Sequence, residues 1–207
     1  MSLNHIMRSV EDYYAAKLRE HGPTPLGVDW NSAESQILRF EQLSKVCDVS
    51  ASFSIIDYGC GYGALVDYLA GKGLEFFYTG YDISVDMINK AREIHRECQN
   101  CNFISDTSNL SIADYTVASG IFNVKLQTSD EEWHTYMLHT VGRLATLSTK
   151  GFAFNALTSY SDPEKRRPDL HYADALFWFD YCKKHFSRFV ALLHDYPLYE
   201  FTILVKK

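Results

Sequence analysis

IIDYGCGYG, at residues 55–63, leads from an apolar run directly into three glycines at alternate positions. The residues that follow, ALVDYL at 64–69, have the apolar spacing of a helix. Glycine at such a strand-to-helix turn lets the backbone bend sharply and lets a ligand approach it closely. The spacing is G-x-G-x-G rather than the G-x-G-x-x-G that seats a dinucleotide pyrophosphate. Because Asp57 precedes the glycines, the turn suits a ligand with a cationic amine better than one with two phosphates.

Further acids follow the next two apolar runs along the chain. One run, at residues 76–82, ends in Asp82, and another, at 102–105, is followed by Asp106. We expect both runs to be strands, and the carboxyl ends of parallel strands meet at the edge where open α/β sheets bind ligands. Because Asp82 follows Asp57 by one strand–helix–strand step, its carboxylate is placed to accept hydrogen bonds from both hydroxyls of a ribose.

The rest of the chain also alternates between strand and helix patterns, which implies a mostly parallel sheet. We expect an N-terminal helical segment at residues 1–50 and a core domain at 51–207. The segment holds a helix at 4–21 and a second helix with Asn31 as its N-cap and Glu34 as its capping-box partner. The other expected elements are strands at 115–120, 151–157, 189–193 and 201–205, and helices at 85–92, 133–147 and about 173–186, the first two capped by Ser84 and Ser129.

Composition excludes several classes of function. The chain has 207 residues and a formal net charge of −6, which argues against broad electrostatic binding of nucleic acid. No apolar run is long enough to cross a bilayer, and residues 1–5 lack the pattern of a secretory signal, so we expect a cytoplasmic protein. In that compartment all five cysteines would be free thiols. Cys98-x-x-Cys101 has no matching second pair, so we expect no metal site.

The ordered set of motifs resembles the class I S-adenosylmethionine (SAM)-dependent methyltransferases. The matching stretches are IIDYGCGYG (55–63), YTGYDIS (78–84), FISD (103–106), DYTVASGIFN (114–123) and GFAFNAL (151–157). The two late strands at 189–193 and 201–205 match the antiparallel hairpin that this family adds to its sheet. The resemblance implies an α/β fold with a doubly wound, mostly parallel seven-stranded sheet, a C-terminal antiparallel hairpin and an N-terminal helical cap.

The resemblance also implies that SAM is the cofactor and S-adenosylhomocysteine (SAH) the product. Asp57, Gly59 and Gly61 would line the methionine end, with the Asp57 carboxylate near the amine. Asp82 would hold the ribose hydroxyls, and Asp106 would accept from the adenine amino group. The full set of implied cofactor-binding residues is Asp57, Tyr58, Gly59, Cys60, Gly61, Asp82, Ile83, Met87, Asp106, Thr107, Ser119, Gly120, Ile121 and Phe122.

Methyl transfer from a sulfonium is an in-line displacement, which needs alignment and exclusion of water more than an elaborate set of catalytic groups. We expect a small-molecule acceptor. If a general base is used, His171 is the first candidate, with a plain surface histidine as the alternative, and Tyr172 and Lys125 follow. The candidate substrate-binding residues are Tyr13, Tyr14, Trp30, Asn123 and Tyr160, of which the first two fit a core role equally well.

Other interpretations stay open at this point. The basic cluster Lys165-Arg166-Arg167 is either a site for an anionic substrate group or solvated surface. A partner subunit could supply the basic surface needed to methylate a protein or an RNA, and a SAM-binding subunit without catalysis would carry the same cofactor residues. Residues 119–122 lack the Asn/Asp-Pro-Pro-Tyr-like run of base-amine methyltransferases, which disfavours adenine-amine methylation. The glycine spacing disfavours a nicotinamide-dependent oxidoreductase.

Overall fold

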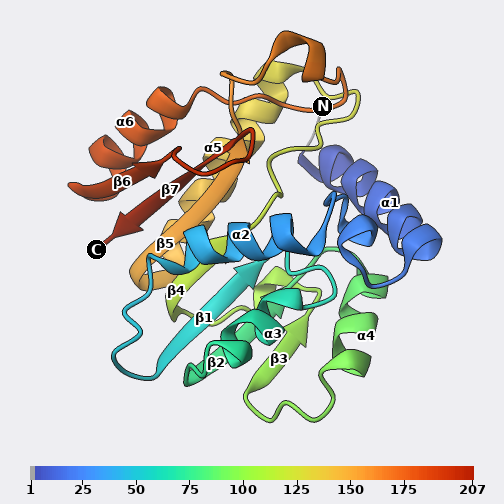
Figure 1. The fold of residues 1–207 in the computed structure, drawn as a ribbon, viewed down its shortest axis with the longest axis vertical. Coiled ribbons are helices and arrows are strands. Elements are labelled where there is room, and N and C mark those ends of the chain that lie inside the picture. Colours follow the sequence, from blue (N-terminus) through green and yellow to red (C-terminus); the bar gives the residue numbers. More distant parts are fainter. Residues whose placement is uncertain (1–2) are drawn as a thin grey trace.

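Seven strands form one sheet in the computed structural model, which describes residues 3–207 (Figure 1). The strands are β1 (Phe53–Tyr58), β2 (Phe76–Tyr81), β3 (Cys101–Ile104), β4 (Ala113–Ala118), β5 (Ser148–Leu157), β6 (Phe189–Leu193) and β7 (Glu200–Lys206). Their order across the sheet is β3-β2-β1-β4-β5-β7-β6. Strands β1 to β5 pair in parallel, whereas β7 runs antiparallel to both β5 and β6. The expected sheet and its late hairpin are therefore confirmed.

Helices cover both faces of this sheet. They are α1 (Leu3–His21), α2 (Ala33–Ser44), α3 (Ala64–Gly71), α4 (Val85–Ile94), α5 (Asp130–Thr146) and α6 (Ala175–His185), with short 3-10 helices η1 (Pro25–Val28), η2 (Thr107–Asn109) and η3 (Pro163–Lys165). One core lies between the sheet and α2, α3 and α4, and includes Leu43, Leu65 and Ile88. A second core lies between the opposite face and α5 and α6. The sheet is thus doubly wound.

The central strands supply side chains to both cores in alternation. In β5, Phe152 and Phe154 belong to the core under α5 and α6, while Ala153 belongs to the core under α2 and α3. Successive side chains of a strand point to opposite faces, so a strand covered on both sides reads as a continuous apolar run. This explains why the stretch GFAFNAL, at residues 151–157, does not alternate between apolar and polar residues and has its first polar side chain at Asn155.

Several helix starts follow the expected capping chemistry. Ser84 Oγ accepts from the Met87 N–H at 3.3 Å, and Ser129 Oγ accepts from the Glu132 N–H at 3.3 Å. Both N-caps are confirmed. The prediction for α2 was wrong by one residue, because Ser32 rather than Asn31 is the N-cap and accepts from the Ser35 N–H at 3.2 Å. A cap bonds the third residue after it, so Glu34 falls one position short of a capping box.

Element ends differ from the expected ones by small shifts. Strand β4 spans residues 113–118 rather than 115–120, because the backbone turns at Gly120, whose φ is 76°. Helix α6 begins at Ala175 rather than near 173, because Ala173 still forms a parallel bridge with Thr158. Strand β3 begins and ends one residue earlier than expected.

The expectation of five free thiols is wrong for one pair. Cys98 and Cys101 form a disulfide, because the turn between α4 and β3 brings their Cα atoms to 5.4 Å. Cys47, Cys60 and Cys182 are buried free cysteines, as expected.

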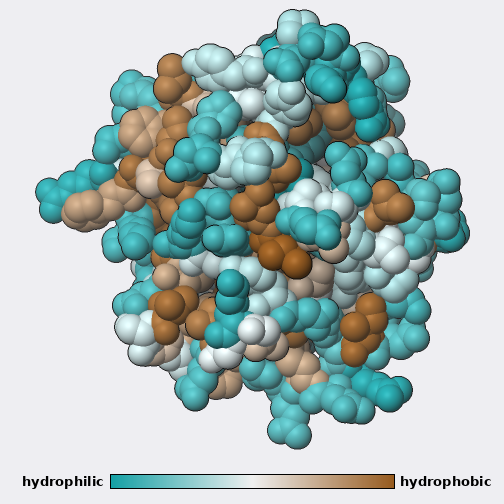
Figure 2. All heavy atoms as spheres, viewed as in Figure 1, coloured by the Kyte–Doolittle hydropathy of each residue, from teal (hydrophilic) through white to brown (hydrophobic). Residues whose placement is uncertain are grey.

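The surface is mixed in character. Figure 2 shows hydrophobic residues in small patches among hydrophilic ones on the face seen in Figure 1. No helix within residues 3–207 has the length and apolar character needed to span a membrane. The predicted 1–50 segment corresponds to α1, η1 and α2, apart from residues 1 and 2, which lie outside the described residues. That the 1–50 segment is a unit separate from residues 51–207 stays a prediction.

Candidate functional site

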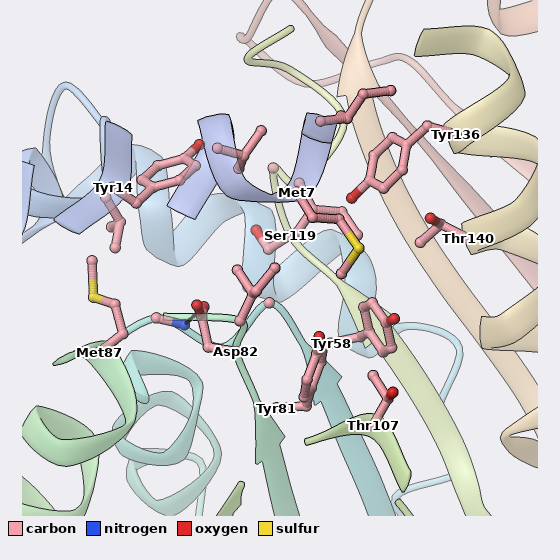
Figure 3. A pocket seen from close by; sticks show the side chains of 18 of the residues that line it. Met7, Tyr14, Tyr58, Tyr81, Asp82, Met87, Thr107, Ser119, Tyr136 and Thr140 are labelled. Atoms are coloured by element: carbon pink, nitrogen blue, oxygen red, sulfur yellow. Dashed lines mark hydrogen bonds between the residues drawn. The ribbon is translucent and has the colours of Figure 1, made fainter. Parts of the chain in front are cut away.

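A cavity of about 280 Å³ lies at the carboxyl edge of the sheet, against α1 (Figure 3). The turn after β1 and the ends of β2 and β4 form one side, and α1 and α5 form the others. Its lining residues are Ile6, Met7, Val10, Tyr14, Val28, Trp30, Tyr58, Gly59, Gly61, Tyr81, Asp82, Ile83, Met87, Thr107, Ser119, Gly120, Ile121, Tyr136, His139, Thr140 and Arg143. We call this the first cavity.

The glycine turn after β1 is held tightly against its neighbours. Gly59 and Gly61 have φ angles of 87° and 54°, in the left-handed region that favours glycine. A Cβ on Gly59 would lie 2.2 Å from Cγ2 of Ile121, so the loop after β4 packs directly on the turn. The N–H groups of Gly59 and Cys60 donate to the Tyr81 carbonyl at 2.7 and 2.9 Å. The glycines therefore serve the packing of two loops as well as the approach of a ligand.

Asp82 faces the first cavity from the end of β2, as Figure 3 shows. Its carboxylate oxygens accept the N–H groups of Gly61 at 2.8 Å and Ser84 at 2.9 Å. A carboxylate has about four acceptor positions, so about two remain for a ligand. Burial raises the pKa of Asp82 to about 6, against the effect of the two backbone donors. At neutral pH the carboxylate is therefore ionised and can accept from two neighbouring hydroxyls.

Asp57 is placed differently. It is 2% exposed, does not line the first cavity, and accepts the Tyr78 hydroxyl at 2.9 Å. Burial raises the pKa of Asp57 to about 7, while the Tyr78 hydrogen bond acts in the opposite direction. Tyr58, the next residue along β1, points to the other face and does line the cavity. The expected contact of Asp57 with a ligand amine stays a prediction.

The loop after β4 offers an unsatisfied polar group. Ser119 Oγ is buried and has no hydrogen-bond partner within residues 3–207, although Ser119 lines the first cavity. An unpaired buried hydroxyl is costly, and a bound polar ligand would satisfy it. The adjacent Gly120 has φ 76°, and a Cβ there would lie 2.3 Å from the Trp30 ring. Trp30 therefore covers this loop closely.

Tyrosines form much of the remaining wall. The rings of Tyr58 and Tyr81 lie 4.7 Å apart between centroids. Burial raises the pKa of Tyr14 and of Tyr136 far above the usual value, so both hydroxyls stay protonated and can donate. The π faces of such rings attract a cationic group.

A second cavity, of about 270 Å³, adjoins the first and shares Tyr14, Val28 and Trp30 with it. Its other lining residues are Asp29, Asn31, Arg39, Asn123, Val124, Leu157, Ser161, Lys165, Arg167, Leu170, Tyr172, Tyr199 and Glu200. Hydroxyl, amide and charged groups are frequent among them. The two cavities therefore meet at an aromatic junction but differ in chemistry.

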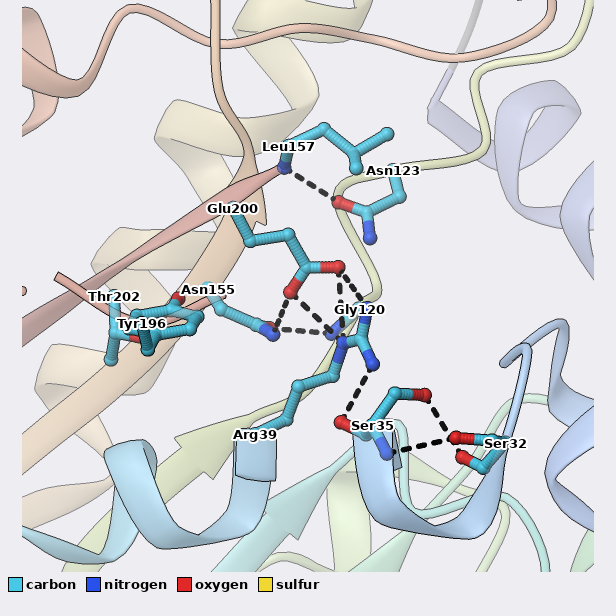
Figure 4. Close-up of polar contacts among 10 residues, drawn as sticks. All are labelled: Ser32, Ser35, Arg39, Gly120, Asn123, Asn155, Leu157, Tyr196, Glu200 and Thr202. Atoms are coloured by element: carbon cyan, nitrogen blue, oxygen red, sulfur yellow. Dashed lines mark hydrogen bonds and ion pairs between the residues drawn. The ribbon is translucent and has the colours of Figure 1, made fainter. Parts of the chain in front are cut away.

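A buried ion pair between Arg39 and Glu200, shown in Figure 4, lies next to Trp30 of that junction. Arg39 Nε donates to both Glu200 oxygens at 3.0 Å, and the Arg39 guanidinium stacks on the Trp30 ring at 3.8 Å. Asn155 joins this pair to the loop after β4: its Nδ2 donates to Glu200 at 2.7 Å, and its Oδ1 accepts the Gly120 N–H at 2.7 Å. The network fixes Trp30 and the Ser119–Gly120 loop relative to each other.

The candidate base His171 lies outside both linings. Its Nδ1 is 3.2 Å from Asp130 Oδ1, and Lys125 Nζ is 3.7 Å from the same oxygen. Burial lowers the pKa of His171, while Asp130 acts to raise it. Tyr172, in contrast, lines the second cavity. The catalytic role of all three residues stays a prediction.

The structure brings together most of the predicted cofactor-binding residues and separates a few. Tyr58, Gly59, Gly61, Asp82, Ile83, Met87, Thr107, Ser119, Gly120 and Ile121 line the first cavity. Asp57, Cys60, Asp106 and Phe122 do not: Cys60 and Phe122 are buried, and Asp106 is the N-cap of η2, where its carboxylate accepts from Ser108.

The predicted substrate-binding residues are also divided. Tyr14 and Trp30 line both cavities, and Asn123 lines the second. Tyr13 lines neither, and its hydroxyl donates to Asp29 at 2.8 Å. Tyr160 is 64% exposed and lies beside His194.

Some lining residues were not foreseen. Met7 on α1, and Tyr136, His139, Thr140 and Arg143 on α5, line the first cavity. The spacing of the four α5 residues, at i, i+3, i+4 and i+7, is a helix-face signal that was available in the sequence. The Arg39–Glu200 pair joins residues 161 positions apart and carried no local signal.

Known proteins provide an independent comparison. The family model described as a methyltransferase domain matches residues 55–145. A Mycobacterium tuberculosis protein, Rv1506c, which is named as a candidate methyltransferase, is 50% identical over 163 residues, covering 79% of this chain and 98% of that protein.

Two solved structures share the fold over nearly their whole length. The N-methyltransferase NodS from Bradyrhizobium japonicum WM9, in complex with SAH, has a TM-score of 0.65 and 16% identity over 94% of this chain and 97% of that one. The DhpI–SAH complex has a TM-score of 0.66 and 13% identity over 99% and 98%. Together with the sheet order and the matched motifs, these findings show that the chain belongs to the class I SAM-dependent methyltransferases.

Proposed function

We propose that this chain transfers a methyl group from SAM to a small-molecule acceptor, with SAM in the first cavity. The observation that carries the proposal is the position of Asp82, whose ionised carboxylate faces the cavity beside the glycine turn with acceptor capacity to spare. The cofactor supplies an activated methyl group on a sulfonium, so the protein has to bind, align and exclude water.

The residues present fit that cofactor. Asp82 would accept from the two ribose hydroxyls, and the unpaired Ser119 hydroxyl would bond a polar group of the methionine tail. Tyr14 and Tyr136 would present rings to the sulfonium and shield it from water. A second cavity of about 270 Å³ that adjoins the first is of a size for a small acceptor. NodS, a neighbour in fold, is itself an N-methyltransferase.

Calorimetric titration tests the proposal. We expect SAH to bind with a stoichiometry of one, whereas NADH gives no saturable heat. Asp82→Asn should weaken SAH binding by about 1–3 kcal/mol, roughly 5- to 150-fold, because it removes a charge-assisted acceptor. Asp86→Asn is the matched control, because Asp86 is exposed on α4 and lines neither cavity.

A folded wild-type protein without affinity for SAH would contradict the cofactor site. If the wild-type protein and Asp82→Asn bind SAH with equal affinity, Asp82 is not part of the cofactor site. Transfer of labelled methyl to a macromolecule in preference to small molecules would favour the alternative of a partner-dependent enzyme. His171, Tyr172 and Lys125 enter this proposal as candidate proton acceptors only.

A further inference from the structure

We propose that the second cavity binds the methyl acceptor and that this acceptor carries a carboxylate or phosphate group, which Lys165 and Arg167 bind. The inference rests on the proposed function, because it assigns the acceptor site next to the cofactor site. It goes beyond that function in naming the acceptor's chemical class and the residues that select it.

The position of the second cavity suits an acceptor. Because it shares Tyr14, Val28 and Trp30 with the first cavity, a molecule in it lies next to whatever the first cavity holds. In-line displacement requires the nucleophile and the methyl donor to approach from adjoining spaces. Trp30 is fixed at this junction between Gly120 and the Arg39 guanidinium.

The inner charges of the second cavity already have protein partners. Arg39 and Glu200 form a buried bidentate pair, and Asn155 also donates to Glu200. Asp29 is 3.0 Å from Lys17 Nζ and accepts the Tyr13 hydroxyl. Neither acid is therefore an open site for a cationic acceptor. The inner wall offers hydrogen-bonding groups with little net charge.

The outer end is electropositive. Lys165 ends η3 and is exposed, and no carboxylate within residues 3–207 forms an ion pair with it. Arg167 uses Nε and Nη2 to hold Asp169, and its side chain also interacts with the Tyr13 hydroxyl, which still leaves some of its five N–H donors for a ligand. Of the neighbouring acids, Asp162, Glu164 and Asp169 do not line the cavity, and Asp169 is the one paired with Arg167.

Tyr172 connects this end to the interior. Its hydroxyl accepts the Arg167 N–H at 2.9 Å, and the Arg166 guanidinium lies 5.3 Å from its ring centroid. Since the oxygen is held by that backbone donor, the hydroxyl proton remains available to an acceptor oxygen. The cations of Lys165 and Arg167, together with the oriented Tyr172 hydroxyl, are suited to bind an oxyanion.

The test titrates inorganic phosphate or acetate into the full chain saturated with SAH. Amide chemical shifts, recorded by NMR at constant ionic strength, report the binding of each probe. We expect saturable shifts at Asn31, Asn123 and Tyr172, and none at Gly59 or Gly61. The double variant Lys165→Gln/Arg167→Gln should bind the probe with an affinity that is lower by about fivefold or more. Lys72→Gln/Arg96→Gln is the control, because both residues are exposed and line neither cavity.

The outcomes separate the two proposals. Failure of SAH to bind in the same sample overturns the proposed function. If SAH binds but neither phosphate nor acetate gives saturable shifts, the proposal of an anionic acceptor is overturned and the proposed function stands. The same holds if the wild-type and Lys165→Gln/Arg167→Gln proteins bind the probes with equal affinity. Tighter binding of phosphate than of acetate assigns a phosphorylated acceptor, and the reverse assigns a carboxylic acid.

Discussion

Asp57 and Asp82 follow one another at the ends of two adjacent parallel strands, yet their carboxylates have different surroundings. Asp82 lies in the first cavity with two backbone donors, and Asp57 lies under the glycine turn with Tyr78 as its partner. The difference follows from their places along the strands: Asp57 lies within β1 and faces the core that contains Tyr78, whereas Asp82 follows the last residue of β2 and lines the cavity. Each carboxylate therefore leads to a different prediction at the scale of one residue.

Ionisation of Asp82 should make SAH binding depend on pH. Its pKa of about 6 means that the carboxylate is charged above pH 6 and gains a proton as the pH falls through that value. A protonated carboxyl accepts hydroxyl donors poorly, so affinity should fall roughly tenfold per pH unit below the pKa. Calorimetry between pH 5 and pH 8 measures this, and the dependence should disappear in Asp82→Asn. A flat profile for the wild-type protein would exclude Asp82 as the titrating group.

Asp57 should affect stability instead. Its folded pKa of about 7 lies above that of an unfolded aspartate, so its contribution favours folding at low pH and is lost as the pH rises to 7. Asp57→Asn removes this charge, and we expect it to raise the free energy of unfolding at pH 8, by at most about 4 kcal/mol, and by less at pH 5. Urea unfolding of both proteins at the two pH values measures the difference. If Asp57→Asn is instead less stable than the wild-type protein, and more so at pH 8 than at pH 5, the predicted stabilisation is contradicted.

Residues near the glycine turn could be predicted from local pattern, whereas their orientation could not. The positions of Gly59, Gly61, Asp82 and Ser119 follow from the ends of recognisable strands. The exclusion of Cys60 and Phe122 from the cavity depends on which way each side chain packs within the folded core. Sequence spacing alone does not carry that information.

At the scale of elements, the Arg39–Glu200 pair joins α2 to β7. Removing one member of a buried pair leaves the other charge uncompensated, so Arg39→Met or Glu200→Gln should each destabilise the protein by about 3–5 kcal/mol. The double variant Arg39→Met/Glu200→Gln should cost less than the sum of the two effects. Denaturant unfolding measures all three.

The exposed pair Lys184–Asp180 on α6 provides the control for that experiment. Lys184→Met should change stability by less than about 1 kcal/mol, because an exposed ion pair contributes little. Effects of Arg39→Met no larger than those of Lys184→Met would show that the buried pair contributes no more than a surface one.

The elements themselves were largely predictable because the chain marks their starts. Ser84 and Ser129 stand directly before apolar periodic runs, and the apolar strands are covered on both faces. The disulfide was missed because spacing does not show that the turn after α4 brings Cys98 and Cys101 together. The second cavity was foreseen only in parts, since α2 and β7 contribute to it from distant positions.

At the scale of the whole molecule, a ligand that binds only the native state stabilises it by mass action. SAH at 100 times its dissociation constant should contribute about 2.7 kcal/mol. For a chain of this size that corresponds to a rise in Tm of roughly 5–11 °C. Differential scanning calorimetry with SAH, and with NADH as the control, measures the shift. An equal shift with NADH would contradict a SAM-specific pocket.

Strand β7 lies between β5 and β6 and brings Glu200 to Arg39, 161 positions earlier in the chain. During synthesis on the ribosome, Arg39 emerges long before its carboxylate partner has been translated. The nascent α2 must therefore keep its guanidinium hydrated, and the junction beside Trp30 can close only after position 200 is made. Assembly of the second cavity is consequently a late event that follows translation of position 200, while the glycine turn and Asp82 can form earlier.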